Sequence, residues 1–285
     1  MRLDEDYLRE LELWPMFALK PGGIARQPAS SAAPDSEPLE VAAGMRSQPV
    51  SARVAPSAAA SVTVPPVARP TVPPGGPVAP AGLAAVVADP ARAAQIAALD
   101  WAGLKRETQA CTACGLCKQR KQAVLGVGAL DAPWLFIGEG PGAEEDAQGE
   151  PFVGPAGKLL DAMLAATGLA RGREVYIANV VNCRPPGNRT PSLDEAQACA
   201  PFLDRQIALI KPKLIVALGK TAVMRLTGSD ASMASLRGQQ YHYQGIPVVA
   251  TYHPSYLLRN LPEKLKAWED LVLARKSMAA ITANT

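Results

Sequence analysis

Residues 134–142 read WLFIGEGPG, and this stretch carries two signals about the fold. Its first four residues are apolar, as in a strand that other elements cover on both faces. Its last five contain three glycines, which let the backbone approach a ligand closely, and a proline that fixes the turn. The stretch therefore predicts a buried strand that ends in a ligand-binding loop.

The sequence around this strand alternates between apolar runs and amphipathic stretches. The runs are 175–181, 214–218 and 246–251, and the amphipathic stretches are 157–167, 192–210, 220–226 and 263–278. Ser192 followed by Glu195 predicts the start of a helix, and Gly168 predicts a helix end. Such alternation predicts an α/β fold, a three-layer α/β/α sandwich with a mostly parallel central sheet. In these sheets ligands bind at the carboxyl ends of the strands.

Composition separates this domain from the region before it. Fifteen of the 27 prolines precede residue 91, and residues 21–91 are mostly Ala, Pro, Val, Ser and Gly, without helical or strand periodicity. We expect a disordered N-terminal linker there, because proline removes backbone donors and favours extended conformers. Residues 92–280 are long enough for one core and form the predicted domain. Apolar side chains in residues 1–20 recur at nearly helical spacing, so a docking peptide for a protein partner and a frayed terminus are both open.

The net charge of the chain is only +3, so any surface that binds nucleic acid must be a local patch. No apolar run is long enough to span a bilayer, and the first residues do not resemble a signal sequence. We therefore expect a cytoplasmic protein without a membrane partner. We also expect the protein to be a monomer. In a reducing compartment, cysteine thiols stay available as metal ligands.

Five cysteines form the clearest pattern in the chain. Cys111, Cys114 and Cys117 have the spacing C-x2-C-x2-C. Much later in the chain, Cys183 and Cys199 lie on either side of a Pro/Gly-rich loop at 184–189, with Cys183 before it and Cys199 after it. Thiols in this pattern indicate a metal centre rather than a disulfide framework, and four of them suit an iron–sulfur cluster. A structural zinc site usually has two short Cys or His pairs, and neither Cys183 nor Cys199 has a His beside it. A zinc site and ordinary buried thiols stay open as alternatives.

Polar motifs follow three of the predicted strands. GEGPG at 138–142 is followed by EED at 144–146 and GEPFVG at 149–154, while NVVNCRPPGNR spans 179–189 and YHPSYLLRN spans 252–260. GEGPG alone is a weak motif, since it is neither G-x-G-x-x-G nor a P-loop, and the acidic residues nearby would repel a triphosphate. Because parallel strands end at one edge of a sheet, the motifs are expected to bring a carboxylate, an amide and an imidazole to one crevice.

In this order and with these cysteines, the motifs resemble family 4 uracil-DNA glycosylases, the iron–sulfur branch of that superfamily, over about residues 100–278. The resemblance implies a uracil-DNA glycosylase-like fold and a DNA repair enzyme. Such an enzyme flips uracil out of single- or double-stranded DNA and hydrolyses its N-glycosidic bond, which leaves an abasic site for base-excision repair. The resemblance also implies a 4Fe-4S cluster on Cys111, Cys114, Cys183 and Cys199, with Cys117 outside the ligand set.

Several residues of the motifs suit the recognition of uracil. The Asn179 amide can donate to uracil O4 and accept from N3–H, and the face of Phe152 can stack on the base. Their ordinary alternatives are a turn-capping amide and a core aromatic residue. Similarity places His253 beside the leaving uracil, where it or adjacent backbone amides stabilise charge on O2. His242 is expected on the surface of a strand.

The group that positions the attacking water has the weakest support. Several relatives in the superfamily carry Asp after the residue that corresponds to Glu139, whereas this chain has Gly140, which is expected at the uracil pocket. Glu139 and Asn188 are the preferred pair, and Glu145 is expected to be a pocket wall that excludes the thymine methyl group. The motifs contain no lysine to form a Schiff base, so strand cleavage is not expected.

The same motifs offer residues that can hold and bend DNA. Contacts with phosphates are expected from a helix N-terminus at 154–158, with Lys158, and from Arg184, Arg189 and Arg259. A wedge that fills the gap left by the flipped base is expected from Tyr256, Leu257 and Leu258. The alternative for these three residues is a hydrophobic loop packed on the domain.

Two other classes of function stay open from the sequence. One is an iron–sulfur protein that works in electron transfer or redox sensing, with Cys117 as an extra thiol. The other is a nucleic-acid-binding module without catalysis that recruits partners through its N-terminal peptide. Release of free uracil from DNA distinguishes both classes from a glycosylase.

Overall fold

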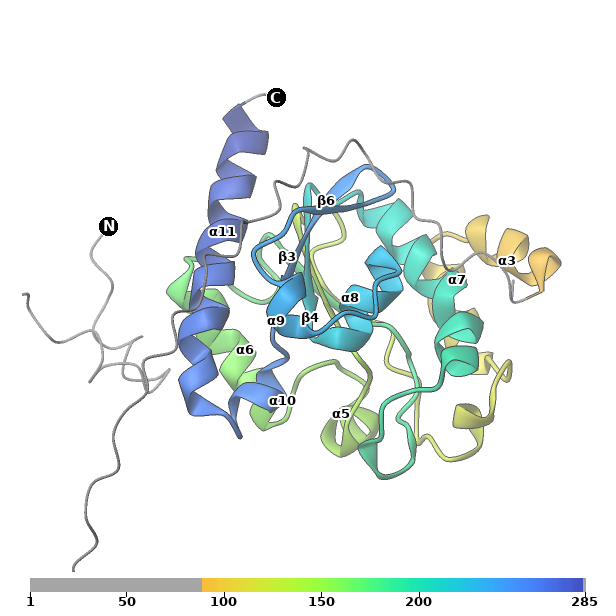
Figure 1. The fold of residues 1–285 in the computed structure, drawn as a ribbon. Coiled ribbons are helices and arrows are strands. Elements are labelled where there is room, and N and C mark those ends of the chain that lie inside the picture. The colour runs from red at the N-terminus through yellow and green to blue at the C-terminus, as the bar shows by residue number, and fades with distance from the viewer. Residues whose placement is uncertain (1–88, 284–285) are drawn as a thin grey trace, which may run out of the picture. The chain divides into compact units, whose positions relative to one another are not determined.

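The computed structural model describes residues 89–283 (Figure 1). The predicted docking peptide at 1–20 and the predicted linker up to residue 88 lie outside the described residues. The first described element is α3 (Pro90–Ala97), and the Asp89 carboxylate caps it by accepting a hydrogen bond of 3.0 Å from the Ala91 backbone N–H. Residues 90 and 91, which the sequence assigned to the linker, are therefore helical.

The centre of the domain is a six-stranded sheet with the order β1-β3-β2-β4-β6-β5. The four inner strands are parallel: β2 (Trp134–Gly138), β3 (Val175–Asn179), β4 (Leu214–Leu218) and β6 (Ile246–Thr251). Short antiparallel strands form both edges, β1 (Val127–Gly128) and β5 (Tyr241–Tyr243). Every residue of β2, β3 and β4 is buried, as their continuous apolar sequences predict.

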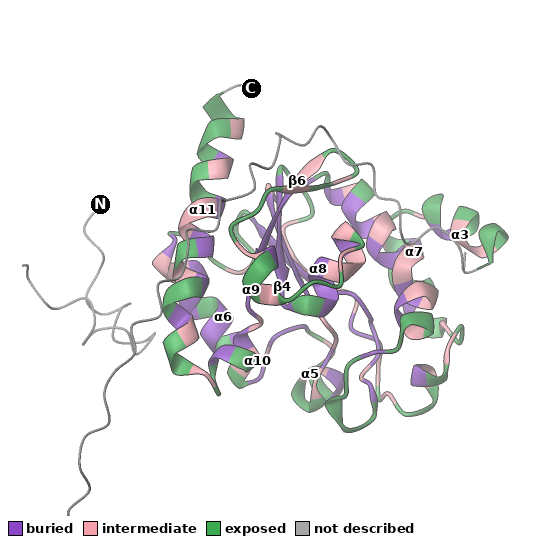
Figure 2. Ribbon diagram, in the orientation of Figure 1, coloured by how far each residue is buried: buried purple, intermediate pink, exposed green. Residues whose placement is uncertain are grey.

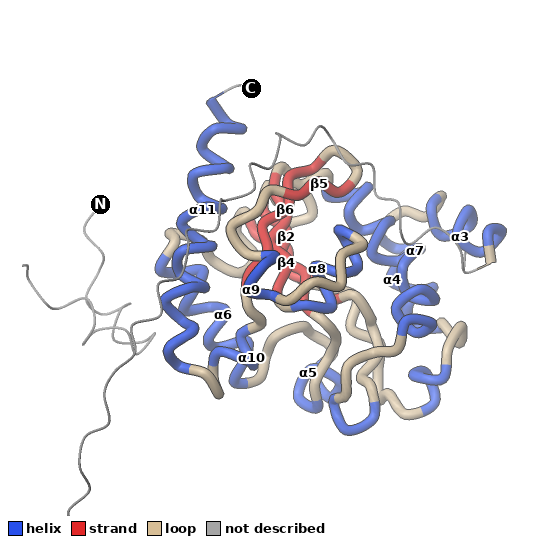
Figure 3. Tube along the Cα trace, viewed as in Figure 1, coloured by secondary structure: helices blue, strands red, loops and turns tan. Residues whose placement is uncertain are grey.

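Helices cover both faces of the sheet, as Figures 1 and 3 show. On one face, Leu135 and Ile137 pack in a core with α3, α4 (Trp101–Ala110), α7 (Leu193–Ile210) and α8 (Lys220–Thr227). On the other face, Trp134 and Phe136 pack with α6 (Pro155–Ala166) and α11 (Lys264–Ala283). Figure 2 shows the buried residues gathered between the layers. The predicted three-layer α/β/α sandwich with a mostly parallel sheet is confirmed.

Local signals set several helix ends. The Ser192 hydroxyl accepts from the Glu195 N–H at 3.2 Å, and the Glu195 carboxylate accepts from the Ser192 N–H at 2.8 Å, so the predicted capping box starts α7. Gly168 follows the end of α6 with a φ of 75°, a conformation that favours glycine. Within residues 89–283, no helix is long and apolar enough to cross a membrane.

Short helices and 3-10 turns complete the domain, and three of them follow the carboxyl ends of strands. The short α-helices are α5 (Ala143–Gln148), α9 (Met233–Leu236) and α10 (Pro254–Leu257). The 3-10 turns are η1 (Gly115–Lys118), η2 (Pro186–Asn188) and η3 (Leu261–Glu263). The loops that carry α5, η2 and α10 start from β2, β3 and β6, so they position the residues of the site below.

Candidate active site

A cleft of about 470 Å³ opens where the inner strands end. Its walls come from the loops after β2, β3, β4 and β6, the edge at which the sequence predicted ligand binding. Many of the predicted site residues line this cleft: Glu139, Gly140, Glu145, Phe152, Asn179, Asn188, Arg189, His253, Tyr256 and Arg259. The remaining predicted residues, Lys158, Arg184, Leu257 and Leu258, lie outside its lining.

The cleft also contains residues that were not among the predicted site residues, although several of them belong to the same motifs. They include Leu218, Gly219 and Lys220, at the end of β4 and the start of α8, together with Pro141, Gly142, Ala156, Pro185, Thr190 and Ser255. The loop after β4 has no motif of its own, because its glycine and lysine are common residues at a helix start. Its position was nevertheless implied by the sheet, since β4 lies between β2 and β6 and ends at the same edge.

The inner end of the cleft carries a buried amide without a partner. Asn179, the last residue of β3, is 2% exposed, and its Oδ1 atom has no hydrogen-bond donor among the described residues. A Cβ atom at Gly138, the neighbouring residue of β2, would lie 2.5 Å from both this oxygen and the Phe152 ring. Only glycine at 138 therefore leaves room for the Asn179 amide and Phe152 to meet. A buried acceptor without a donor is costly, so this oxygen is suited to a donor on a ligand.

Phe152 is held in a strained turn beside this amide. Its φ is 55°, a region that non-glycine residues rarely adopt. The Arg171 guanidinium supports the turn by donating to the carbonyl oxygens of Pro151 at 2.8 Å and Phe152 at 2.7 Å. The helix α6 packs so closely that a Cβ at Gly157 would be 1.8 Å from the Phe152 carbonyl oxygen. The ring is thus fixed at the cleft by its own backbone and by α6.

His253 caps α10 and faces Phe152. The two rings stack, with centroids 5.5 Å apart and planes at 29°. The Nδ1 atom accepts a hydrogen bond of 3.2 Å from the Ser255 backbone N–H and lies 2.8 Å from the Ser255 hydroxyl. With Nδ1 as the acceptor of both contacts, the neutral ring carries its proton on Nε2. Nε2 is buried and has no partner among residues 89–283. Burial, and next the charge of Arg259, lower the His253 pKa to about 4, although Glu145 opposes the shift. The ring is therefore a neutral donor whose N–H has no acceptor within the described protein.

The two candidate carboxylates have different surroundings. Glu139 accepts a hydrogen bond from the Thr221 hydroxyl, which the start of α8 brings to the loop after β2. Glu145 accepts from three backbone amides, at 3.0 Å from Gly142, 2.9 Å from Val153 and 3.0 Å from Gly154. Both oxygens of Glu145 are therefore used to join the GEGPG and GEPFVG loops. Glu145 thus forms part of the cleft wall, and Glu139 lines the same cleft.

The loop after β3 forms the opposite wall. Asn188 is exposed, has a φ of 56°, and its Oδ1 accepts from the Arg184 guanidinium at 2.8 Å. Arg189 forms a paired contact with Glu195, with two nitrogen–oxygen distances of 2.7 Å. The Glu195 carboxylate thus neutralises the charge of Arg189, and this contact weakens the expectation that Arg189 holds a phosphate.

The predicted wedge divides into two kinds of residue. Tyr256 is 37% exposed and Leu258 is 42% exposed, so both present apolar surface beside the cleft. Leu257 is only 1% exposed and packs in the core with α6 and α11. The expectation that Leu257 contacts DNA is therefore wrong for this residue, because the short helix α10 turns its side chain toward the domain. Lys158 and Arg259 are exposed, and His242 is exposed on β5 as expected.

The cysteines converge from separate segments. Cys111 and Cys114 pack against the core that contains Cys183, just after β3, and Cys199, within α7. Three of the sulfur atoms accept hydrogen bonds: Cys183 from Arg120 at 2.9 Å, Cys199 from the Asn182 N–H at 3.3 Å, and Cys111 from Arg92 at 3.5 Å. Within the described residues, no group of three or more Cys, His, Asp or Glu is arranged to hold a single metal ion. The donor set is four thiols with N–H groups directed at sulfur, which fits the surroundings of an iron–sulfur cluster.

Comparison with known proteins identifies the class to which this fold and site belong. The model of the uracil DNA glycosylase superfamily matches residues 125–272. The chain is 49% identical over 158 residues to the type-4 uracil-DNA glycosylase of Thermotoga maritima, covering 55% of this chain and 82% of that protein. It is 43% identical over 171 residues to the type-4 enzyme of Pyrobaculum aerophilum, covering 57% and 87%. The chain belongs to the uracil DNA glycosylase superfamily and, within it, to the type-4 family.

Proposed function

We propose that this chain removes uracil from DNA by hydrolysing the N-glycosidic bond, which leaves an abasic site for repair. The observation that carries the proposal is the pair of buried, unpartnered atoms in one cleft, the acceptor Asn179 Oδ1 and the donor His253 Nε2. Uracil offers a complementary pair, because its N3–H is a donor and its O2 is an acceptor. A base inside a duplex cannot reach such a cleft, so the nucleotide must be flipped out of the stack.

The amide and the imidazole have separate tasks in this proposal. Asn179 reads the base: its Oδ1 accepts from N3–H while its amide nitrogen donates to O4. The His253 Nε2–H donates to O2, where negative charge grows as the bond to the sugar breaks. A neutral imidazole is suited to this role, since it needs no counter-ion in a closed pocket and already has the required tautomer. Phe152 and Gly138 fix the shape of the space that the base enters.

Glu139 is the proposed partner of the sugar and of the attacking water. The sugar becomes cationic as uracil leaves, and a carboxylate nearby stabilises that charge and orients water toward C1′. Asn188 can complete this arrangement from the opposite wall once its contact with Arg184 opens. Glu145 keeps Gly142, Val153 and Gly154 in place and so forms the wall on the remaining side, where it is proposed to exclude the thymine methyl group. A Cβ atom at Gly140 would lie 2.7 Å from a Val181 methyl carbon, so glycine lets this part of the pocket wall pack against the loop after β3.

DNA is proposed to lie across the exposed residues at the rim of the cleft. Lys220 and Arg259 line the cleft, and Lys158 and Arg184 flank it; all four suit phosphate contacts. The sequence motifs contain no lysine, but the fold brings Lys220 to the cleft. Its exposed position at the start of α8 suits contact with a phosphate rather than formation of a Schiff base. Tyr256 and Leu258 are proposed to fill the gap that the flipped base leaves. Uracil-containing DNA is therefore the proposed partner, and no second subunit is needed to complete this site.

We also propose that Cys111, Cys114, Cys183 and Cys199 hold a 4Fe-4S cluster, in keeping with the expected reducing cytoplasm. Bound there, the cluster would supply four iron–thiolate bonds that join the segment before the sheet, the loop after β3 and α7. Arg120, Arg92 and the Asn182 N–H would then donate to thiolates. Cys183 precedes Pro185 of the cleft wall by two positions, so the same bonds would restrain that wall.

The test is the release of free uracil by the full-length protein, purified without oxygen. An oligonucleotide with one uracil should yield free uracil and an alkali-sensitive abasic site, whereas the matched oligonucleotide with thymine should yield neither. The strand itself should stay intact before alkali treatment. DNA binding without any uracil release would overturn the proposal and favour a non-catalytic binding module.

A further inference from the structure

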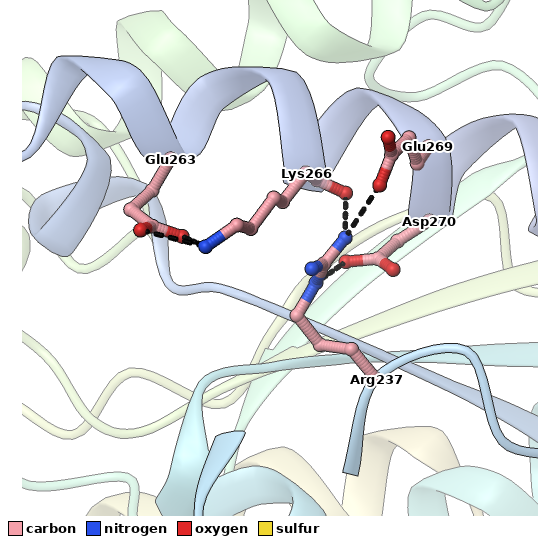
Figure 4. A network of polar contacts seen from close by, with 5 residues as sticks. All are labelled: Arg237, Glu263, Lys266, Glu269 and Asp270. Atoms are coloured by element: carbon pink, nitrogen blue, oxygen red, sulfur yellow. Dashed lines mark hydrogen bonds and ion pairs between the residues drawn. The ribbon is translucent and has the colours of Figure 1, made fainter. Parts of the chain in front are cut away.

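Arg237 connects the loop after α9 to the last helix, as Figure 4 shows. Its Nε donates to the Asp270 carboxylate at 2.6 Å, and its Nη2 donates to the Lys266 carbonyl oxygen and lies 3.5 Å from Glu269. The Arg237 side chain is 11% exposed and that of Asp270 is 2% exposed. A guanidinium held by several acceptors of α11 cannot rotate freely, because two of its nitrogens, Nε and Nη2, are engaged.

The Arg237 guanidinium lies over the first of two stacked aromatic rings that lead to the cleft. The guanidinium carbon lies 5.2 Å from the centre of the Tyr252 ring. Tyr252 in turn stacks on Tyr256, with ring centroids 5.1 Å apart and planes at 23°. Arg237 itself does not line the cleft, whereas Tyr256 does. The stack therefore runs from the buried Asp270 on α11 to the rim of the candidate active site.

The two tyrosines stand on either side of His253 in the chain. The backbone bonds of this segment are local, from the Tyr256 N–H to the His253 carbonyl at 2.9 Å and from the Leu257 N–H to the same oxygen at 3.2 Å. A turn that is bonded mainly to itself takes its orientation from its side chains. Leu257 anchors one end in the core, and Tyr252, under Arg237, anchors the other. The direction in which His253 faces thus depends on the Tyr252 stack.

We propose that Arg237 is a positioning residue for uracil excision, and that it orients His253 and Tyr256 through the face of Tyr252. This inference rests on the function proposed above. Asp270 and the Lys266 carbonyl fix Arg237, Arg237 fixes the plane of Tyr252, and Tyr252 sets the angle of the turn that carries His253 Nε2 and Tyr256. Arg237 touches neither the base nor the sugar in this arrangement.

The chain contains a matched control with the same chemistry. Arg225 on α8 contacts the Asp204 carboxylate at 2.5 Å and donates to the Tyr243 hydroxyl at 3.1 Å. Its guanidinium carbon lies 5.4 Å from the centre of the Tyr243 ring. This second Arg–Asp–Tyr group joins α7, α8 and β5, and none of its members lines the cleft. Its removal costs a similar set of contacts without loosening the His253 turn.

The experiment compares Arg237→Met, Arg237→Lys and Arg225→Met in the full-length protein with its cluster loaded. Single-turnover uracil release separates the maximal rate from the affinity for the oligonucleotide, and thermal unfolding reports stability. Because misplacing a reacting group by about 1 Å can cost a hundredfold, Arg237→Met should lower the maximal rate by roughly tenfold to a hundredfold. Its Kd for the oligonucleotide should change much less. Arg225→Met should lose comparable stability and keep the wild-type rate.

Arg237→Lys distinguishes the stack from the charge. Lysine keeps the positive charge beside Asp270 but offers no flat face to Tyr252, so stability should recover while the rate stays low. The inference is overturned if Arg237→Met keeps the wild-type rate, or if both methionine variants lose rate in proportion to stability. A wild-type protein that binds the oligonucleotide but releases no uracil would instead overturn the proposed function, together with the positioning role that depends on it.

Discussion

At the scale of single residues, the most informative atoms are those that the folded chain leaves without partners. Most buried polar atoms in proteins have a hydrogen bond, so an exception requires an explanation. Asn179 Oδ1 and His253 Nε2 are two such exceptions, and they come from different strand ends to one cleft. Because one is an acceptor and the other a donor, they define the hydrogen-bond pattern of the ligand.

Base choice should depend on Asn179. Uracil presents a donor at N3 and an acceptor at O4, whereas cytosine presents the reverse, so one fixed amide cannot satisfy both bases. An unmatched buried polar pair costs roughly 1–3 kcal/mol, or about tenfold to a hundredfold in rate. Asn179→Asp should therefore slow uracil release and admit weak cytosine release, because the carboxylate repels O4 and accepts from N4–H. Single-turnover release of each base from matched oligonucleotides measures both effects.

If the Asn179→Asp protein kept both the uracil rate and the discrimination, Asn179 would not contact the base. The natural control is Asn182, a second buried asparagine three positions along the chain that does not line the cleft. Its replacement by Asp should change stability but not base choice.

The pH dependence of excision should follow His253. Its pKa is lowered from 6.5 to about 4 by burial and by Arg259, so the ring stays neutral and able to donate over most of the acidic range. The single-turnover rate should therefore be nearly flat from neutral pH to about pH 5 and fall near pH 4. Protonation of an ordinary histidine would instead reduce the rate near pH 6.5. A reduction there, absent from His253→Gln, would contradict a buried neutral ring.

The same shift predicts a change in stability with a definite sign. Between about pH 6.5 and pH 4 the unfolded chain binds a proton at His253 that the folded chain does not. The contribution of His253 thus makes the folded state less stable as the pH falls through this window, and it is constant above it. Thermal unfolding of wild type and His253→Gln over this range isolates that contribution.

At the scale of elements, the sequence predicted the apolar strands and the long amphipathic helices well, and the shortest helices poorly. The bounds of β4 and β6 match the predicted runs, and α7 begins at the predicted capping box. The helices α5, α9 and α10 are one or two turns long, so they contain too few residues to show a period. Missing α10 led directly to the wrong assignment of Leu257, since a loop exposes consecutive side chains and a helical turn buries some of them.

The contact between α8 and the loop after β2 leads to a prediction about Glu139. No pattern in the sequence links Thr221 to Glu139, because the contact arises only when β4 and β2 lie side by side. Thr221→Val removes the hydroxyl that holds the carboxylate. Since a hydrogen bond to a charged group contributes about 1.5–3 kcal/mol, excision should slow by roughly tenfold to a hundredfold. Thr221→Ser keeps the hydroxyl and should stay close to wild type in single-turnover assays.

Equal rates of uracil release by Thr221→Val and Thr221→Ser would show that the hydrogen bond from Thr221 to Glu139 does not contribute to excision. Uracil release by Glu139→Gln then decides between two remaining arrangements. A slow Glu139→Gln enzyme would mean that the carboxylate works without the threonine. A Glu139→Gln enzyme with the wild-type rate would mean that another residue of the cleft orients the attacking water.

At the scale of the whole molecule, two observations connect the cysteine segments to the walls of the cleft. The Asp146 carboxylate of α5 accepts from the Lys121 N–H at 2.8 Å, which ties the loop after β2 to the segment that follows Cys117. Cys183 precedes Pro185 and Asn188 in the opposite wall. The sequence could indicate which cysteines share a pattern, but the links from their segments to both walls depend on buried contacts that only the fold creates.

The cluster proposal predicts different outcomes for two cysteines. Cys183 is buried beside Cys111 and Cys114, so Cys183→Ser should lose iron, sulfide and visible absorbance, lower the unfolding temperature and slow uracil release. Cys117 belongs to the short turn η1 and lies outside the proposed ligand set, so Cys117→Ser should keep its colour, its stability and its rate. Iron and sulfide content, measured beside thermal unfolding, reports the cluster independently of activity.

If the Cys111→Ser protein kept its iron and the Cys117→Ser protein lost it, the fourth ligand would be Cys117 and not Cys111. If the wild-type protein were colourless and yet stable and fully active, no cluster would be needed. The packing of the four thiols and their N–H donors would then be enough to stabilise the cleft walls.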